Sequence, residues 1–276
     1  MSNPASSNLA PQGLSPNEAV LEIIKRAASD KSNPVKTINS ILYMVASWRA
    51  NQLAQSRLDI AQGRVMSGPF QGMNFYFNDT LGCYAPKLLG VYEMEMHNFI
   101  RQAIAKQYEA VINIGCAEGY YAVGFATTMP NSVIHAHDID EKLQAVTQRV
   151  AEKNNVAHRI KIGGLFDGSR FAEFKGKRTL VFCDIEGAER ELIDPTAYPE
   201  LLNMDILLEC HECFIPELRK VFIERFSKTH DITWQEPELR WGKFNIDLPN
   251  IDDLDLCLLS YENRAGATPW GYFKKK

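Results

Sequence analysis

A glycine-rich turn between a short apolar run and a helix-like segment is the part of this sequence best suited to holding a ligand. Residues 111–114 are apolar enough for a strand, residues 115–119 read Gly-Cys-Ala-Glu-Gly, and Tyr120 begins the segment that follows. Small residues let the main chain approach a ligand, and N–H groups at a helix start favour a polar or anionic group. We predict a cofactor-binding turn, and a purely structural glycine turn is the alternative.

A carboxylate follows this turn at the distance expected of a ribose ligand. Residues 132–137 form an apolar-rich run, and Asp138 ends it about 20 residues beyond the turn, where a ribose diol would find acceptor oxygens. The alternative is that Asp138 caps the next helix. Asp140 competes for that role, because apolar residues at helical spacing follow it closely. We expect Asp138 to bind ribose.

Three later strand-like segments also end in polar residues or loops, at 159–164, 179–184 and 204–212. Strand-like and helix-like segments alternate here, which is typical of a mostly parallel sheet with helices on both faces. Ligands of such sheets bind outside the carboxyl ends of the strands. We therefore expect five strand ends to meet in one crevice, at Gly115, Asp138, Phe166, Asp184 and His211.

Composition sets broad limits on the protein. The chain has 276 residues, 45% of them hydrophobic, and a formal net charge of −4, which fits one α/β domain with an extension and argues against nucleic-acid binding. The basic run 274–276 reads as a solvated tail. Six cysteines, mostly in strand-like runs, suggest reduced thiols and a cytoplasmic location. No apolar run is long enough to suggest a membrane span.

The chain divides into three predicted parts. Residues 1–15 read as a disordered leader, 16–90 as a helical and β-ribbon extension, and 91–276 as the catalytic domain. In the extension, Ser15-Pro16-Asn17-Glu18 predicts a capped helix, and a second helix begins at Asn33-Pro34. The extension could cover the active site, form a homodimer or cover a sheet face.

His211 is the residue best suited to proton transfer. Its titration range fits a general base, and Glu209 or Glu212 could orient it; a hydrogen bond to a neighbouring loop is the alternative. Asp184, Glu186 and Glu209 could instead hold Mg²⁺. An acidic helix start explains this acidic stretch as well, so a divalent metal is not favoured and no metal ligand is assigned.

Four motifs together resemble class I S-adenosylmethionine-dependent methyltransferases, most closely the FkbM-type branch. They are residues 114–121, 137–140, 183–189 and 208–212, and the similarity spans roughly residues 108–264. The resemblance implies a Rossmann-like, seven-stranded, mostly parallel sheet. It also implies that the last two strands form a hairpin antiparallel to the rest, and residues 230–234 and 254–259 would be these strands.

The resemblance also implies S-adenosyl-L-methionine as the cofactor. The glycine turn would face its methionine part, Asp138 its ribose, and the loop with Leu165 and Phe166 its adenine. The sequence departs from the family at Asn113, where relatives carry an acid that Glu118 could replace, and at Ala117, where they carry glycine. The implied cofactor-binding residues are Asn113, Gly115, Cys116, Ala117, Glu118, Gly119, Tyr120, Asp138, Ile139, Leu165, Phe166 and Asp184. The candidate catalytic residues are His211, Glu209 and Asp184.

The activity implied by this resemblance is methylation of a hydroxyl on a small or sugar-like molecule. One alternative is a nicotinamide-dependent oxidoreductase, which would require a Gly-x-Gly-x-x-Gly turn that residues 115–120 do not form. The other is a non-catalytic module that binds a nucleoside or a partner, the partner through the helices of the extension. We expect a small-molecule substrate and neither a nucleic-acid nor a membrane partner.

Overall fold

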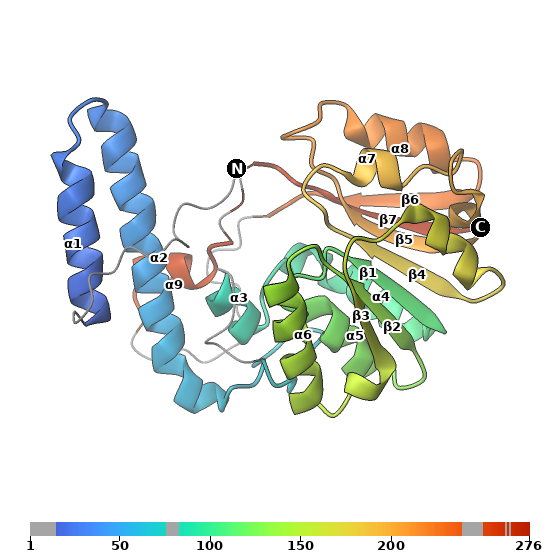
Figure 1. Cartoon of the computed structure of the whole chain (residues 1–276), viewed down its shortest axis with the longest axis horizontal. Helices are drawn as coiled ribbons and strands as arrows, with labels where there is room; N and C mark the ends of the chain where they lie inside the picture. The colour runs from blue at the N-terminus through green and yellow to red at the C-terminus, as the bar shows by residue number, and fades with distance from the viewer. Residues whose placement is uncertain (1–14, 76–82, 239–250, 263, 265) are drawn as a thin grey trace.

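A computed structural model describes residues 15–75, 83–238, 251–262, 264 and 266–276 (Figure 1). Within these residues, seven strands form one sheet in the order β3-β2-β1-β4-β5-β7-β6. Strands β1 to β5 are parallel, and β7 is antiparallel to both β5 and β6. The predicted fold class is confirmed. The strands are β1 (Ala110–Ile114), β2 (Val133–His137), β3 (Ile160–Gly163), β4 (Thr179–Cys183), β5 (Asp205–Glu209), β6 (His230–Gln235) and β7 (Trp270–Lys275).

The predicted last strand is wrong. Residues 254–259 lie in the helix α9 (Asp253–Leu259), whose N-cap Asp252 accepts a hydrogen bond from the Asp255 backbone N–H at 2.8 Å. The pattern of apolar and polar residues in this segment fits either a strand or one face of a short helix. The hydrogen bond of the N-cap residue stabilises the helix. The seventh strand is β7, so Lys274 and Lys275 belong to the sheet and not to a solvated tail. Of the seven described strands, only β7 runs against the others.

Helices cover both faces of the sheet (Figure 1). One face carries α4 (His97–Lys106), α5 (Tyr120–Thr128) and α6 (Glu141–Lys153), and the other carries η5 (Gly168–Phe174), α7 (Glu189–Leu192), η6 (Pro199–Asn203) and α8 (Leu218–Phe226). Successive strand residues face opposite sides, so Val111 joins the core under α5 and Ile112 the core under α8. A short η4 (Ala157–Arg159) precedes β3. The six cysteines, all of them in described positions, are free thiols.

The extension begins with two helices at one end of the sheet domain, α1 (Pro16–Ser29) and α2 (Pro34–Ala61) (Figure 1). Ser15 and Glu18 form the predicted capping box of α1, while the rest of the predicted leader lies outside the described residues. Arg49 of α2 binds the carboxylate of Asp255 in α9 through two hydrogen bonds of 2.8 and 2.5 Å. No helix that the structure describes combines the length and apolar character needed to cross a bilayer.

The predicted β-ribbon is reduced to one bridge. Arg64 pairs with Asn74 in an isolated antiparallel bridge. Phe70 between them is buried and packs edge-on against Tyr120 and Phe125 of α5. This segment therefore forms part of the core beneath the extension. It leads into α3 (Tyr84–Leu89) and η3 (Met94–Met96).

A buried ion pair connects the extension to the glycine turn. The ammonium group of Lys87 in α3 contacts the carboxylate of Glu118, and the two side chains are 8% and 2% exposed. Lys87 also lies over the ring of Tyr92, 4.6 Å from its centroid. The pair holds Glu118 against α3, so this carboxylate is engaged within the protein.

We expect Lys87→Met to destabilise the protein by about 3–5 kcal/mol, because it leaves the carboxylate of Glu118 buried without its cation. The double variant Lys87→Met/Glu118→Gln should recover part of this loss. Chemical denaturation of both variants checks the prediction, with Lys25→Met as the control, since Lys25 pairs with Glu22 on the surface. Equal loss in the Lys87 and Lys25 variants would contradict it.

Candidate active site

The turn after β1 and the end of β2 face each other. The backbone N–H groups of Gly115 and Cys116 both donate to the carbonyl oxygen of His137 at 2.9 Å. The Ala117 N–H donates to Oδ2 of Asp138 at 2.8 Å, and the Asp140 N–H donates to Oδ1 at 2.9 Å. Asp140 is the N-cap of α6. The structure thus brings Asp138 to the turn and gives the capping role to Asp140.

The turn is tight because its residues adopt left-handed backbone conformations. Gly115 has φ +78°, and a Cβ there would lie 1.7 Å from the carbonyl oxygen of Asp184. Gly119 has φ +86°, and its Cβ would lie 2.9 Å from the side chain of Thr147. Ala117 has φ +45°, a region that favours glycine. Glycine would adopt this conformation at position 117 with less strain than alanine does.

Two exposed apolar side chains flank Asp138. Ile139 is 79% exposed after β2, and Leu165 is 81% exposed after β3. The two strands pair in parallel, and the Asp138 N–H donates to the carbonyl oxygen of Gly163 at 3.1 Å. Exposed side chains of this size at adjacent strand ends offer an apolar surface for a flat ring. Phe166 differs, since it is buried with its ring 5.0 Å from His137.

Asn113 lies fully buried in β1, and neither polar atom of its side-chain amide has a hydrogen-bond partner among the described residues. It is level with Ala136 of β2 and Phe182 of β4. Buried amides are normally hydrogen-bonded. Tyr120, at the start of α5, also has a buried hydroxyl without a partner. Asn113 and Tyr120 lie on either side of the glycine turn in the sequence, and neither polar group is paired with a residue that the structure describes.

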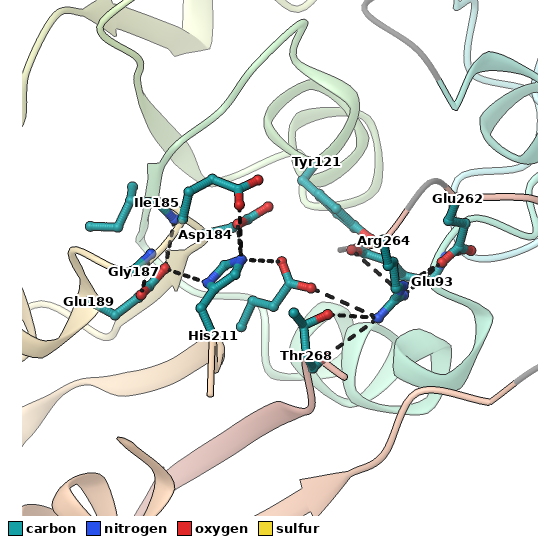
Figure 2. Close-up of polar contacts among 12 residues, drawn as sticks. Glu93, Tyr121, Asp184, Ile185, Gly187, Glu189, His211, Glu262, Arg264 and Thr268 are labelled. Atoms are coloured by element: carbon teal, nitrogen blue, oxygen red, sulfur yellow. Dashed lines mark hydrogen bonds and ion pairs between the residues drawn. The ribbon is translucent and has the colours of Figure 1, made fainter. Parts of the chain in front are cut away.

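His211 follows β5 and is held by Glu189 (Figure 2). The Nδ1 atom of His211 lies 2.9 Å from Oε1 of Glu189, whose carboxylate also accepts the backbone N–H groups of Ile185 and Gly187 at 2.9 Å. Glu212, one of the two residues predicted to orient His211, does not contact it. Its carboxylate contacts Arg219 instead.

Three further carboxylates face Nε2 of His211. The distances are 3.5 Å to Glu186, 3.6 Å to Glu209 and 3.8 Å to Asp184. Burial alone would lower the pKa of His211, but the hydrogen bond to Glu189 and the nearby carboxylates outweigh it and raise the pKa above its ordinary value. Burial raises the pKa of Asp184 to about 6 and also raises that of Glu209.

These groups could also hold a cation. One ligand atom each of Asp184, Glu186 and His211 lies within 4.8 Å of the others. This candidate set differs from the alternative considered from the sequence in having His211 in place of Glu209. Carboxylate oxygen and imidazole nitrogen are ordinary metal ligands. The same carboxylates stabilise a protonated His211 without an ion.

Arg264 lies beside the group of side chains that surrounds His211 (Figure 2). Its guanidinium is 2.6 Å from Glu95, 2.7 Å from Glu262, 3.8 Å from Glu209 and 3.9 Å from Glu93. Burial raises the pKa of Glu93 to about 8, and the Tyr121 hydroxyl donates to this carboxyl. Glu209 therefore lies between an imidazole and a guanidinium, with one carboxylate oxygen toward His211 and the other toward Arg264.

Three of these residues, Glu189, Glu93 and Arg264, were not among the site residues predicted from the sequence. Glu189 belongs to a quoted motif, and its position four residues after Ile185 could have suggested that it closes the loop onto its own backbone. Glu93 and Arg264 are far apart in the chain, and no local pattern connects them.

Comparison with known proteins gives likenesses in structure alone. No family model matches the chain, and no curated protein matches its sequence. The METTL16 MTase domain is 12% identical with a TM-score of 0.48, over 82% of this chain and 78% of that one. The O-methyltransferase TomG from Streptomyces achromogenes, in complex with SAM, is 11% identical with a TM-score of 0.45, over 83% and 89%. An O-methyltransferase from Bacillus cereus, in complex with SAH, is 11% identical with a TM-score of 0.42, over 83% and 90%.

Proposed function

We propose that this protein is an S-adenosyl-L-methionine-dependent methyltransferase that methylates a hydroxyl of a small or sugar-like molecule. The observation that carries the proposal is the meeting of three features at one edge of the sheet. They are the glycine turn, the Asp138 carboxylate held against it, and the exposed pair Ile139 and Leu165. A backbone cradle, a diol acceptor and an apolar slot are the three surfaces that a nucleoside requires.

The residues present fit each part of this cofactor. Asp138 would accept hydrogen bonds from the ribose, and Ile139 and Leu165 would lie against the adenine. Asn113, with its unsatisfied buried amide, would serve the methionine end beside the turn. Phe166 supports the adenine loop from within, because it packs on His137. When bound, the cofactor supplies an electrophilic methyl group on a sulfonium.

The task left to the protein is alignment and removal of a proton. Methyl transfer to a hydroxyl is an in-line displacement, so the acceptor oxygen must be held opposite the leaving sulfur. His211 would take the proton of that hydroxyl at Nε2, since Nδ1 is engaged by Glu189. Glu209 and Asp184 face the same nitrogen and would stabilise the imidazolium that forms. Glu189 acts as a positioning residue, because it fixes the ring without facing the acceptor.

If the cofactor assignment is right, S-adenosylhomocysteine binds to the protein. Asp138→Ala should weaken this binding by about tenfold or more, because a hydrogen bond to a charged acceptor contributes about 1.5–3 kcal/mol. Titration calorimetry measures it, with NAD titrated in parallel. Asp140→Ala is the matched control, since it removes a neighbouring carboxylate that caps α6. Wild-type affinity in the Asp138 variant, or binding of NAD alone, would refute the assignment.

The proposed base predicts a pH effect with a defined sign. His211 must be neutral to accept a proton, and its pKa is raised, so turnover should increase with pH through a value above 6.5. Glu189→Gln removes a negative charge that favours the imidazolium and should move this rise to lower pH. Glu212→Gln is the control, because Glu212 contacts Arg219.

Two measurements check this prediction. NMR titration of the His211 ring in the complex with S-adenosylhomocysteine gives the pKa without knowledge of the acceptor. Labelled methyl incorporation into metabolite extracts finds an acceptor, for which His211→Ala should bind cofactor but not turn over. Full turnover in that variant, or an unshifted His211 pKa in Glu189→Gln, would remove these roles.

We also propose that the extension forms a homodimer. Val35, Ile38, Leu42 and Val45 recur along α2 at helical spacing and are 69%, 65%, 63% and 37% exposed. Four exposed apolar side chains on one helix face support burial against a second copy. We expect Ile38→Glu/Leu42→Glu to convert a dimer into a monomer in light scattering, while Lys36→Glu leaves the dimer intact. A monomeric wild type would contradict the proposal.

A further inference from the structure

A cleft of about 840 Å³ lies at the opposite edge of the sheet from the candidate active site. Tyr108 precedes β1, Arg178 precedes β4, and Asp205 begins β5, so the cleft lies at the amino ends of these strands. Lys275, at the end of the reversed strand β7, lies at the same edge. The chain's C-terminus marks this edge at the right of Figure 1, away from α1 and α2. Strands of this length span about 16 Å, so the two sites are separate.

The lining of the cleft is basic, although the chain as a whole is acidic. The chain has a net charge of −4, yet the acids lining the cleft are Glu200 and Asp205. Asp205 is buried, and its charge is balanced by an ion pair with Lys106. Its carboxylate also accepts hydrogen bonds from the Tyr108 hydroxyl at 2.5 Å and from the Lys275 backbone N–H at 2.9 Å. The basic residues that line the cleft are Lys106, Lys175, Lys177, Arg178 and Lys275.

Two of these cations lack an acceptor within the described part of the chain. Among the residues that the structure describes, the side chains of Lys175 and Arg178 are exposed and have no hydrogen-bond or ion-pair partner. The backbone of Arg178 is nevertheless fixed. Its carbonyl accepts the N–H groups of Glu109 and Ala110 at 2.9 and 3.3 Å, and its own N–H donates to the Glu109 carboxylate at 2.9 Å. A fixed backbone reduces the entropy lost when the guanidinium binds an anion.

The other walls suit a compact ligand. Lys177 and Lys275 are held at Nζ by the Glu173 carbonyl and the Asn203 amide, at 3.4 and 2.9 Å. Each of these ammonium groups still has two hydrogens to donate. The exposed Pro199 ring adds an apolar wall. The volume is within the range of small-molecule sites, and the acidic remainder of the surface would repel a long polyanion.

We propose that this cleft binds a small polyphosphate-bearing molecule, with Lys175 and Arg178 as its principal phosphate contacts. Several clustered cations recognise several linked negative charges, and guanidinium groups match phosphate oxygens in pairs. The shared chemistry is the polyphosphate, which could come from inorganic polyphosphate or from a nucleoside triphosphate. The site is independent of the proposed methyltransferase activity, because it lies at the other edge of the sheet.

Titration calorimetry of the full chain with tripolyphosphate and, in parallel, with ATP tests the proposal. We expect saturable binding that weakens with salt, and a loss of affinity of about tenfold or more in Lys175→Glu/Arg178→Glu, since two contacts become repulsive. Arg26→Glu/Lys31→Glu is the matched control, because it reverses one arginine and one lysine on α1 and the turn after it. The control should bind as the wild type does.

The two ligands distinguish the source of the phosphate. Equal affinity identifies the phosphates alone as the ligand, and tighter binding of ATP adds a contact to the nucleoside; both support the site. Thermal unfolding verifies that both double variants fold. The proposal is overturned if the wild type shows no saturable binding, or if the two double variants bind equally. It is also overturned if an RNA oligonucleotide binds and tripolyphosphate does not displace it.

Discussion

The close approach of the turn after β1 to the end of β4 is the constraint on which the active edge depends. Gly115 leaves no room for a side chain, because the Asp184 carbonyl oxygen occupies the position of a Cβ. With the chain pressed onto β4 there, the next N–H groups reach the end of β2, and Ala117 reaches Asp138. Parallel pairing places the ends of β1, β2 and β4 side by side, and the glycine at position 115 lets the turn after β1 pack closely against the other two.

Around that site, the protein keeps many carboxyl groups close together with few cations. Burial favours their neutral forms, as the raised pKa values of Glu93 and Asp184 indicate. Arg264 balances part of the remaining negative charge, His211 does so when it is protonated, and Glu209 lies between the two. A change of charge at one cation is therefore felt by groups on β4, β5 and the loop before α4. The proton proposed to move at His211 would therefore be bound by a ring that is in contact with four carboxyl groups.

Local signals made much of this structure predictable from the sequence. The Ser15 capping box, the glycine turn and the carboxylate after β2 are each defined within a few residues, and all lie where expected. Contacts between distant segments could not be predicted, because packing alone brings Lys87 to Glu118 and Arg264 to Glu93. The strand prediction for residues 254–259 was wrong for another reason. Their apolar and polar pattern fits either a strand or a short helix, and the N-cap Asp252 favours the helix.

The position of β7 in the sheet has a consequence for biosynthesis. Trp270–Lys275 is the last strand of the described chain, yet it lies between β5 and β6 and pairs with both. Strands β1 to β5 can assemble as they emerge from the ribosome, because each strand after β1 pairs with one made before it. β6 has no such neighbour, because it pairs only with β7 among the described strands, so it stays unpaired until residues 270–275 have left the ribosome.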